Sequence, residues 1–527
     1  MQPYAKRWFS AGALTVVIGI AAAAGGVLST GTALAATPTG NACNPADGQI
    51  EGRGSTYQTN AQSLWWNAYD TDICGDTPAT GSQSTAAGND MGIYNYTSLS
   101  GSGAGLKSAN CRTDAYAGTD LPYTTAQLTT GLDGTPGNSV IGGCSGSANV
   151  PSPLNFPPDS SSNPGGTWPN SSDATANVMS FPIAGSSTTL DVNLTSADCG
   201  GNATGPLDFT PQQLSDLLGG NILNWNNPEL RNNSENAWLA NCNEPVSRVV
   251  RYDNSGTTGI LKGYFLNVDP NRSGATSTSG CDPSPWSNYD NPSLSNNSIW
   301  PTNGTATGTG DGSGGTGVGF TATANCSAIV SGSASGGPVL LQTLVNTAGG
   351  IGYADLSDAE LDTGTLPGGG TGLFKSVLIR PGVESATNPG AYVQPQNLKG
   401  ANCDYSALST PDGGAPTGFV GLDVPAAGSS AAADTWADDN TVNHENATDQ
   451  GSLYPICGLT FDLVYSGLSA SSGSAIADLT ADQRRTLYSY LLFILSSTAQ
   501  NLLPTDYYAA LPATWLPSIV SGIQANY

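Results

Sequence analysis

A run of eight residues, Arg251–Thr258 (RYDNSGTT), contains the residue types that bind a tetrahedral oxyanion. An arginine guanidinium can donate two parallel hydrogen bonds to an oxyanion, and a nearby carboxylate such as Asp253 can hold the guanidinium in place. Ser255, Gly256 and Thr257 add hydroxyl and backbone N–H donors. The run therefore predicts an anion site, although taken alone it is equally typical of a capped surface turn.

The residues that follow predict a helix that begins at this site. Gly259–Leu266 has apolar residues at helical spacing, and a serine or threonine before such a pattern marks a helix start. The positive end of the helix dipole and its unpaired N–H groups would attract the same anion.

Three earlier features could bring further donors and one acceptor. Gly52–Tyr57 (GRGSTY) is a glycine-rich turn before an amphipathic pattern, and Ser100–Lys107 (SGSGAGLK) follows a predicted strand at Tyr94–Leu99. Such turns let backbone N–H groups approach an anion closely. Asp120 ends another predicted strand, directly before Leu-Pro. Gly52–Tyr57 also has a commoner interpretation as an ordinary capped turn, and Asp120 as the cap of the next turn.

The remaining patterns place these turns in an α/β protein. Phe181–Ala184 and Thr189–Leu194 each predict a strand. Thr210 followed by proline predicts a helix start, and Thr480–Leu502 predicts one long helix. Strands that alternate with helices are typical of an α/β fold.

Length and composition predict two or more lobes with long insertions. After export the chain would keep about 490 residues, which exceeds a single ordinary core. Charged residues make up 10% of the chain, and it contains 68 glycines. Residues 131–172, 282–317 and 413–450 have the composition of surface loops.

The first 35 residues predict a cleaved export signal. Two basic residues precede an apolar stretch, and Ala33–Ala35 is a small-residue cleavage site. An uncleaved membrane anchor is the weaker interpretation, because the apolar stretch is short and interrupted by glycine. No leucine stands three residues before Cys43, the first cysteine, so no lipid-attachment box is evident.

Ten cysteines in an exported chain predict five disulfides. Consecutive pairing is one arrangement among many, because the sequence cannot fix the connectivity. It would join these pairs: Cys43–Cys74, Cys111–Cys144, Cys199–Cys242, Cys281–Cys326 and Cys403–Cys457. Metal binding is less well supported, since no Cys-x-x-Cys occurs and His444 is the single histidine.

The mature chain is strongly acidic. Removal of the signal leaves 13 basic and 40 acidic residues, a net charge of −27. This charge argues against nucleic acid or an anionic membrane as a partner. It does not exclude an anion ligand, because a few convergent donors act through their local field.

Taken in chain order, these segments resemble the phosphate-binding proteins of bacterial phosphate ABC importers. The resemblance covers most of the mature chain and leaves the three loop-like stretches unmatched. It implies an α/β, two-lobed fold of the periplasmic-binding-protein type (type II), with a hinge between the lobes. It also implies lobe 1 at 46–178 and 355–527, with an insertion at about 404–450, and lobe 2 at 179–354.

The resemblance implies the ligand contacts residue by residue. They are Thr56, Tyr57, Ser102, Asp120, Arg251, Ser255, Gly256 and Thr257, with Asp253 holding the arginine. Three positions depart from the family pattern: Tyr57 replaces phenylalanine, Thr119 replaces serine and Asn254 replaces glycine. The backbone N–H of residue 57 does not depend on the ring, and asparagine tolerates left-handed backbone geometry better than most residues.

The first functional hypothesis is a secreted, monomeric protein that closes its lobes on inorganic phosphate and needs no cofactor. It would serve a phosphate ABC permease if it takes part in uptake. Asp120 would select the ligand, because hydrogen phosphate can donate a proton to a buried carboxylate whereas sulfate cannot.

Two alternatives remain open. A phosphoesterase is disfavoured because no activated Ser-His pair or metal cluster is visible. An envelope or adhesion protein that keeps the fold and uses its long loops is favoured by the missing lipid box. The acidic loop residues Asp311, Asp404, Asp438 and Asp439 do not fit an EF-hand calcium loop.

Overall fold

The computed structural model describes residues 38, 40–44, 48–75, 93–97, 101–111, 114–120, 178–201, 205, 207–231, 234–251, 253, 255–269, 328–330, 336–361, 375–376, 378–379, 392–397, 400–403, 405, 454–465 and 479–527. The chain divides into residues 1–34 and 35–527, and every described residue belongs to the second unit. The predicted export signal and the three loop-like stretches lie outside the described residues. No helix in the described part is long and apolar enough to cross a membrane.

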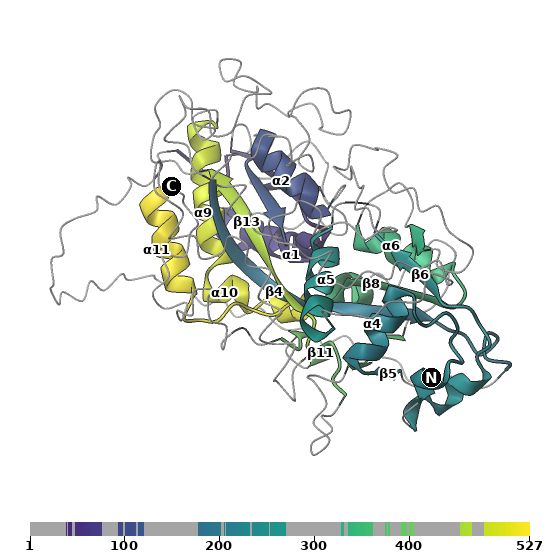
Figure 1. The fold of residues 1–527 in the computed structure, drawn as a ribbon. Helices are drawn as coiled ribbons and strands as arrows, with labels where there is room; N and C mark the ends of the chain where they lie inside the picture. Colours follow the sequence, from purple (N-terminus) through teal and green to yellow (C-terminus); the bar gives the residue numbers. More distant parts are fainter. Residues whose placement is uncertain are drawn as a thin grey trace, which may run out of the picture. The chain divides into compact units, whose positions relative to one another are not determined.

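The described residues form strands and helices that alternate along much of the chain (Figure 1). The strands are β1 (Ile50–Gly54), β2 (Ile93–Thr97), β3 (Tyr116–Thr119), β4 (Val178–Asn193), β5 (Asp208–Phe209), β6 (Ser247–Val250), β7 (Ala328–Val330), β8 (Gly350–Asp355), β9 (Lys375–Ser376), β10 (Leu378–Ile379), β11 (Gln396–Asn397), β12 (Gly400–Ala401) and β13 (Cys457–Tyr465). The helices are η1 (Thr56–Gln58), α1 (Thr59–Tyr69), η2 (Asp70–Cys74), α2 (Gly101–Cys111), α4 (Pro211–Gly219), η4 (Pro228–Arg231), η5 (Glu235–Asn241), α5 (Gly256–Val268), α6 (Gly337–Val345), α7 (Leu356–Leu361), α9 (Ala481–Ile494), α10 (Ser497–Gln500), η10 (Leu503–Asp506) and α11 (Leu516–Asn526). The predicted α/β class is confirmed.

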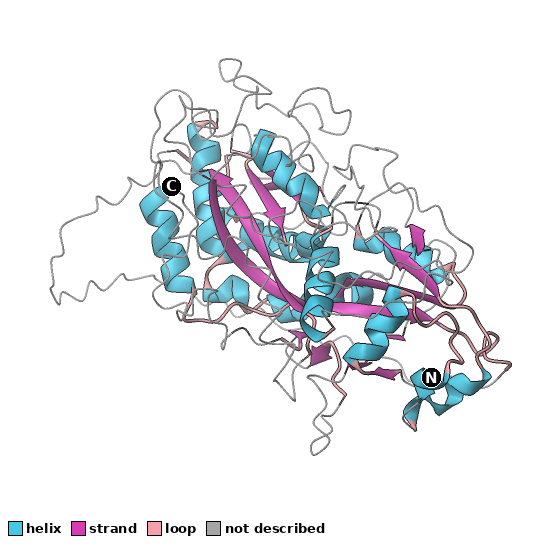
Figure 2. Ribbon diagram, viewed as in Figure 1, coloured by secondary structure: helices cyan, strands magenta, loops and turns pink. Residues whose placement is uncertain are grey.

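The main sheet has the strand order β2-β1-β3-β13-β4-β8-β6-β7, with β9 also paired to β4 (Figure 2). Its two ends are parallel: β1 pairs with β2 and β3, and β6 pairs with β7 and β8. The centre is antiparallel, because β13 pairs with β3 and β4, and β4 pairs with β8. Long antiparallel strands therefore join two parallel α/β units.

The described residues pack around two hydrophobic cores. The first core includes Trp65 of α1 and Leu491 of α9, and the second includes Leu214 of α4 and Leu261 of α5. Two cores are what a two-lobed fold predicts, because each lobe must bury its own apolar faces. The predicted residue boundaries of the lobes stay a prediction.

Strand β4 contributes to both cores and so links them. Its first part pairs with β13 and places Phe181 and Ile183 in the first core. Its last part pairs with β8 and places Leu190 and Val192 in the second. A single strand thus carries the chain from one core to the other (Figure 1).

The prediction of two separate strands in this region was wrong. The Ala-Gly-Ser-Ser-Thr segment at 184–188 looks like a break in the sequence, but it is fully paired, to β13 up to Ser187 and to β8 from Thr188. Pro182 lies where the register between β13 and β4 shifts by one residue. A proline is tolerated at such an irregularity because one hydrogen bond of the ladder is already missing there.

The predicted helix at Thr480–Leu502 begins where expected but is divided. Thr480 caps α9 through a reciprocal pair of hydrogen bonds with Gln483, a capping box. The helix ends at Ile494, and the Ser496 side chain accepts a hydrogen bond from the Ala499 N–H, which starts α10. The helix is therefore interrupted within the periodic pattern, because Ser496 caps a new helix there.

Three predicted disulfides are confirmed: Cys43–Cys74, Cys199–Cys242 and Cys403–Cys457. Each of the other two predicted pairs includes a cysteine outside the described residues. The confirmed bonds fit an oxidising compartment outside the cytoplasm.

Candidate anion-binding site

Arg251 follows the end of β6 and is fixed by the carboxylate two residues later. Its Nε donates to Asp253 Oδ1 over 2.7 Å, and its Nη2 donates to Asp253 Oδ2 over 2.5 Å. Both residues are buried. Burial alone would lower the pKa of the guanidinium, but the charge and hydrogen bonds of Asp253 raise it overall, so Arg251 stays protonated.

The Arg251 guanidinium also contacts η1. Its Nη2 also lies 3.4 Å from the hydroxyl oxygen of Thr56, and this oxygen accepts a hydrogen bond from the Gly337 N–H over 3.4 Å. Nη1 makes no hydrogen bond to a described residue. Because both protons of Nη1 stay available, the guanidinium can still donate two hydrogen bonds to an oxyanion.

Asp120 directly follows β3 and is surrounded by hydroxyl donors. Oδ2 accepts hydrogen bonds from Ser55 (2.5 Å) and Ser102 (2.9 Å), and Oδ1 accepts one from Thr460 (2.8 Å). Burial raises the pKa of Asp120 to about 6, and the three hydroxyls and Arg251 limit that rise. The carboxyl is therefore ionised at neutral pH and titrates at mildly acidic pH.

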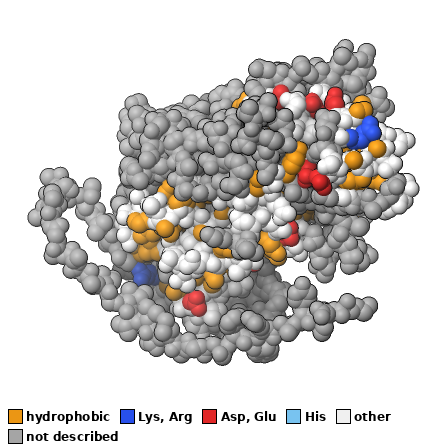
Figure 3. Space-filling view, turned by 90° about the horizontal axis from the view of Figure 1, so that it is seen from below, with side chains coloured by type: hydrophobic (Ala, Val, Ile, Leu, Met, Phe, Trp, Pro, Cys, Tyr) orange, Lys and Arg blue, Asp and Glu red, His pale blue; other side chains and the backbone are white. Residues whose placement is uncertain are grey.

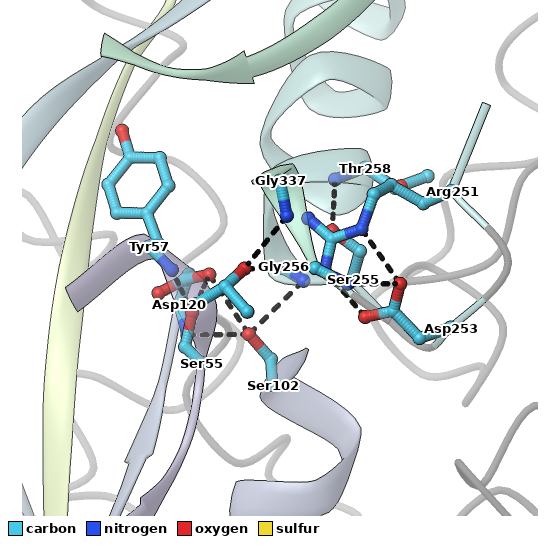
Figure 4. A network of polar contacts seen from close by, with 12 residues as sticks. Ser55, Tyr57, Ser102, Asp120, Arg251, Asp253, Ser255, Gly256, Thr258 and Gly337 are labelled. Carbon is cyan, nitrogen blue, oxygen red and sulfur yellow. Dashed lines mark hydrogen bonds and ion pairs between the residues drawn. The ribbon is translucent and has the colours of Figure 1, made fainter. Parts of the chain in front are cut away.

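The N-terminus of α5 lies against Asp120 and Ser102 (Figure 4). Ser255 caps the helix by accepting a hydrogen bond from the Thr258 N–H, and the Gly256 N–H donates to Ser102 Oγ over 3.1 Å. A Cβ on Gly256 would lie 2.5 Å from both Ser102 Oγ and the Cβ of Asp120. The glycine is thus required for this close approach.

Tyr353 of β8 holds the segment between Arg251 and α5. Its hydroxyl accepts a hydrogen bond from the Arg251 N–H over 3.2 Å and lies 2.6 Å from the Thr258 hydroxyl. Burial raises the pKa of Tyr353 to about 12, so the phenol stays neutral. We infer that Tyr353 fixes the direction in which Arg251 leaves the sheet.

The structure brings together seven of the predicted site residues: Thr56, Ser102, Asp120, Arg251, Asp253, Ser255 and Gly256. Thr257 is buried in the first turn of α5. Asn254, the departure from the family pattern, lies outside the described residues.

Tyr57 is placed differently from the expectation. Its N–H, predicted to face the ligand, donates to Ser55 Oγ over 3.0 Å. Its ring belongs to the second core, and its hydroxyl donates to the carbonyl of Ser186 over 2.6 Å. The tyrosine therefore joins the turn to β4, and its N–H reaches a ligand only if Ser55 turns away.

Sequence reasoning missed Ser55 and Thr460 as parts of the site, and it left open whether Tyr353 packs at the hinge or contacts the ligand. Ser55 stands beside Thr56 in the same turn and could have been suggested by its position as the cap of η1. Thr460 had no local signal, because it is 340 residues from Asp120 in the chain.

The charges of the site are buried, and among the described residues visible in Figure 3 the charged side chains are few and lie apart from one another. Within the described residues, no group of three or more histidine, cysteine or acidic side chains is placed to hold a metal ion. His444 lies outside the described residues. One guanidinium, a helix N-terminus, several hydroxyls and one carboxylate can together bind a protonated anion.

Residues 199–392, which include Arg251, match the family model of the PBP superfamily domain. This match confirms the predicted periplasmic-binding-protein type of fold for the matched segment, which contains α5 and β8. A search of curated proteins gives no match.

Several solved structures are similar to most of the chain at low identity. A high affinity periplasmic phosphate-binding protein (PfluDING) is 17% identical, with 89% of this chain and 92% of that chain covered and a TM-score of 0.48. A phosphate-binding protein from Stenotrophomonas maltophilia is 14% identical, with 90% and 93% covered and a TM-score of 0.46. A putative phosphate ABC transporter substrate-binding protein from Clostridium perfringens is 12% identical, with 88% and 100% covered and a TM-score of 0.37.

Proposed function

We propose that the protein captures inorganic phosphate between Arg251, Asp120 and the N-terminus of α5, without chemical conversion. The observation that carries this proposal is a buried carboxylate opposite a buried guanidinium and a helix N-terminus. The Gly256 and Thr258 N–H groups already donate to Ser102 and Ser255, so Arg251 and the Thr257 N–H supply the donors for the oxygens of the anion. Asp120 supplies the acceptor for its proton.

The Asp120 carboxylate, as a hydrogen-bond acceptor, favours phosphate over oxyanions that carry no proton. Near neutral pH hydrogen phosphate still carries a proton, which it can donate to Asp120. Sulfate carries none, so an ionised Asp120 beside it would stay without a partner, at a cost of about 1–3 kcal/mol or more. The names of the similar solved structures, which include phosphate-binding proteins, agree with this ligand class.

Isothermal titration of the purified protein tests the proposal. At pH 8, in buffer without phosphate, we expect a saturable heat with phosphate and with arsenate, both of which are protonated tetrahedral anions. Sulfate and molybdate should give none or a much weaker signal. The proposal is wrong if phosphate gives no heat, or if sulfate binds as tightly as phosphate at this pH.

Hydrolysis of a phosphate monoester is the matching assay for the alternative function. The hydroxyls of Ser55, Ser102 and Thr460 all donate to the Asp120 carboxylate, so the assay asks whether this carboxylate activates any of them as a nucleophile. Steady release of phosphate from a monoester by the purified protein would favour a phosphoesterase over a binding protein.

The close approach of α5 gives a second prediction. In Gly256→Ala the new methyl group would overlap Ser102 and Asp120, so the first turn of the helix must move away. We expect phosphate affinity to fall about 10- to 100-fold, corresponding to about 1–3 kcal/mol of overpacking. Titration measures the loss, and the unfolding midpoint shows whether the variant is folded; an unchanged affinity in a folded variant would contradict the close approach.

We propose that the protein works outside the cytoplasm as a monomer, after removal of the first 35 residues. The three disulfides and the predicted signal support this location. A phosphate ABC permease is the partner expected if the protein serves uptake. A tethering or adhesion role for the long loops is the alternative. In that case binding to the partner would not depend on Arg251.

A further inference from the structure

A chain of buried side chains leads from the first core to Asp120. Tyr490 of α9 donates to Gln62 Oε1 over 2.6 Å, and Gln62 Nε2 donates to Gln58 Oε1 over 2.7 Å. Gln58 Nε2 donates to Thr460 Oγ1 over 3.0 Å, and Thr460 donates to Asp120 Oδ1 over 2.8 Å. All five residues are buried. Four successive hydrogen bonds therefore end on the carboxylate of the proposed site.

One backbone carbonyl fixes the direction of this chain. Gln58 Nε2 also lies 3.2 Å from the carbonyl oxygen of Phe461, which can only accept a hydrogen bond. The NH₂ group of Gln58 must therefore face β13, and its Oε1 must face Gln62. Gln62 in turn directs its NH₂ group to Gln58, and its Oε1 accepts from Tyr490 and, over 3.3 Å, from Tyr116.

Thr460 is the link that acts on the site. Its oxygen accepts from Gln58, so its single proton is free to be donated, and the shortest acceptor is Asp120 Oδ1. The Thr119 carbonyl is the other acceptor, at 3.4 Å. A carboxylate has about four acceptor positions. Thr460, Ser55 and Ser102 occupy three, which leaves one position of Oδ1 for a ligand proton.

We propose that Gln58 and Thr460 are positioning residues, which hold Asp120 as an oriented hydrogen-bond acceptor for the proton of the ligand. A chain in which every member donates toward the carboxylate stabilises its ionised form, since hydrogen bonds polarise one another along such a chain. This inference rests on the proposed function, because it concerns how the same site recognises a protonated anion.

The other charged or titratable groups near Asp120 act alongside this chain. Arg251 lowers the pKa of Asp120 through its charge. Tyr57 interacts with Asp120 but stays neutral, because burial raises the pKa of its phenol. Asp462 of β13 accepts from Gln62 Nε2 over 3.2 Å, and burial raises its pKa well above the usual value. Thr460 donates to Asp120 Oδ1 and is itself uncharged, so replacing it tests this hydrogen bond without changing the charge of the site.

The test compares Thr460→Val with Thr460→Ser. Valine has the shape of threonine but no hydroxyl, and Gln58 keeps the Phe461 carbonyl as a partner, so the core is conserved. Serine keeps the donor. Sulfate is the probe, because it stays fully ionised between pH 5 and 8 and binds only when Asp120 is protonated.

We expect the wild-type protein to bind sulfate increasingly as the pH falls through about 6. Thr460→Val loses one hydrogen bond to the carboxylate, so the pH at which sulfate binding is half-maximal should rise by about one pH unit. Thr460→Ser should keep the wild-type midpoint, and Gln58→Met should shift it by less than Thr460→Val. Equal midpoints in Thr460→Val and the wild-type protein would overturn the inference.

A readout without ligand separates this inference from the proposed function. Thr460→Val should lower the free energy of unfolding, and this loss should be larger above pH 6 than at pH 4.5. In an Asp120→Asn background the loss should no longer depend on pH. If the wild-type protein binds no phosphate, the proposed function fails, and this pH dependence alone decides whether the chain acts on Asp120. A loss that is equal at both pH values would overturn the inference even where phosphate binds.

Discussion

Replacing Arg251 with alanine is expected to abolish measurable phosphate binding. The guanidinium is the single positive side chain hydrogen-bonded within the described site, and its loss also leaves Asp253 buried without its partner. Breaking a buried ion pair in this way costs about 3–5 kcal/mol. We expect at least a 100-fold loss of affinity by titration and a lower free energy of unfolding by denaturant.

A pair of lysine substitutions separates the geometry of the guanidinium from its charge. Arg251→Lys keeps a positive charge but cannot hold Asp253 with two nitrogens and also reach Thr56, so affinity should still fall about 10-fold or more. Arg248 lies on β6, three residues before Arg251, and donates to the Leu218 carbonyl over 3.3 Å. Arg248→Lys should leave phosphate affinity unchanged, and wild-type affinity in Arg251→Ala would refute the site.

The Asp120→Asn variant is expected to bind sulfate nearly as well as phosphate at pH 8. In the wild-type protein the ionised carboxylate offers an acceptor that sulfate cannot use, which should favour phosphate by about 10- to 100-fold or more. Asparagine removes the charge and can present an NH₂ donor to a fully ionised anion. Titrations with both anions, at pH 8 and pH 5, measure the ratio of the two affinities.

The matched control is Asp191→Asn, the same substitution at another buried aspartate. Asp191 lies on β4 and accepts a hydrogen bond from Thr189 over 2.6 Å. This variant should keep the preference for phosphate. If Asp120→Asn keeps it as well, the carboxylate does not sense the proton of the ligand.

The pKa of Asp120 also predicts a dependence of stability on pH. The folded state raises this pKa from 3.8 to about 6 through burial, so the fold prefers the protonated acid. The contribution of Asp120 to the free energy of unfolding therefore falls as the pH rises from about 4 to about 6 and is constant above. The total change is about 3 kcal/mol at most, and it should be absent from Asp120→Asn.

Local patterns in the sequence determined the parts of the site that are made within a few residues. The bond between Arg251 and Asp253 spans two residues, and the cap of α5 by Ser255 spans three. Helix starts such as Thr210 and Thr480 were predicted for the same reason, because a cap and its N–H partner are neighbours in the chain. The α/β class followed from the alternation of strand and helix patterns.

The tertiary structure decided what surrounds Asp120 and how the two cores are linked. Thr460 and Gln58 reach the site through strand β13 and helix η1, which are some 400 residues apart in sequence, as the Gln58–Thr460 separation of 402 residues shows. No local pattern encodes such a contact. Residues 184–188 look like a turn by composition, yet pairing with β13 and β8 keeps them extended in β4. Pairing with distant strands satisfied the backbone of this segment, and this outweighed its local preference.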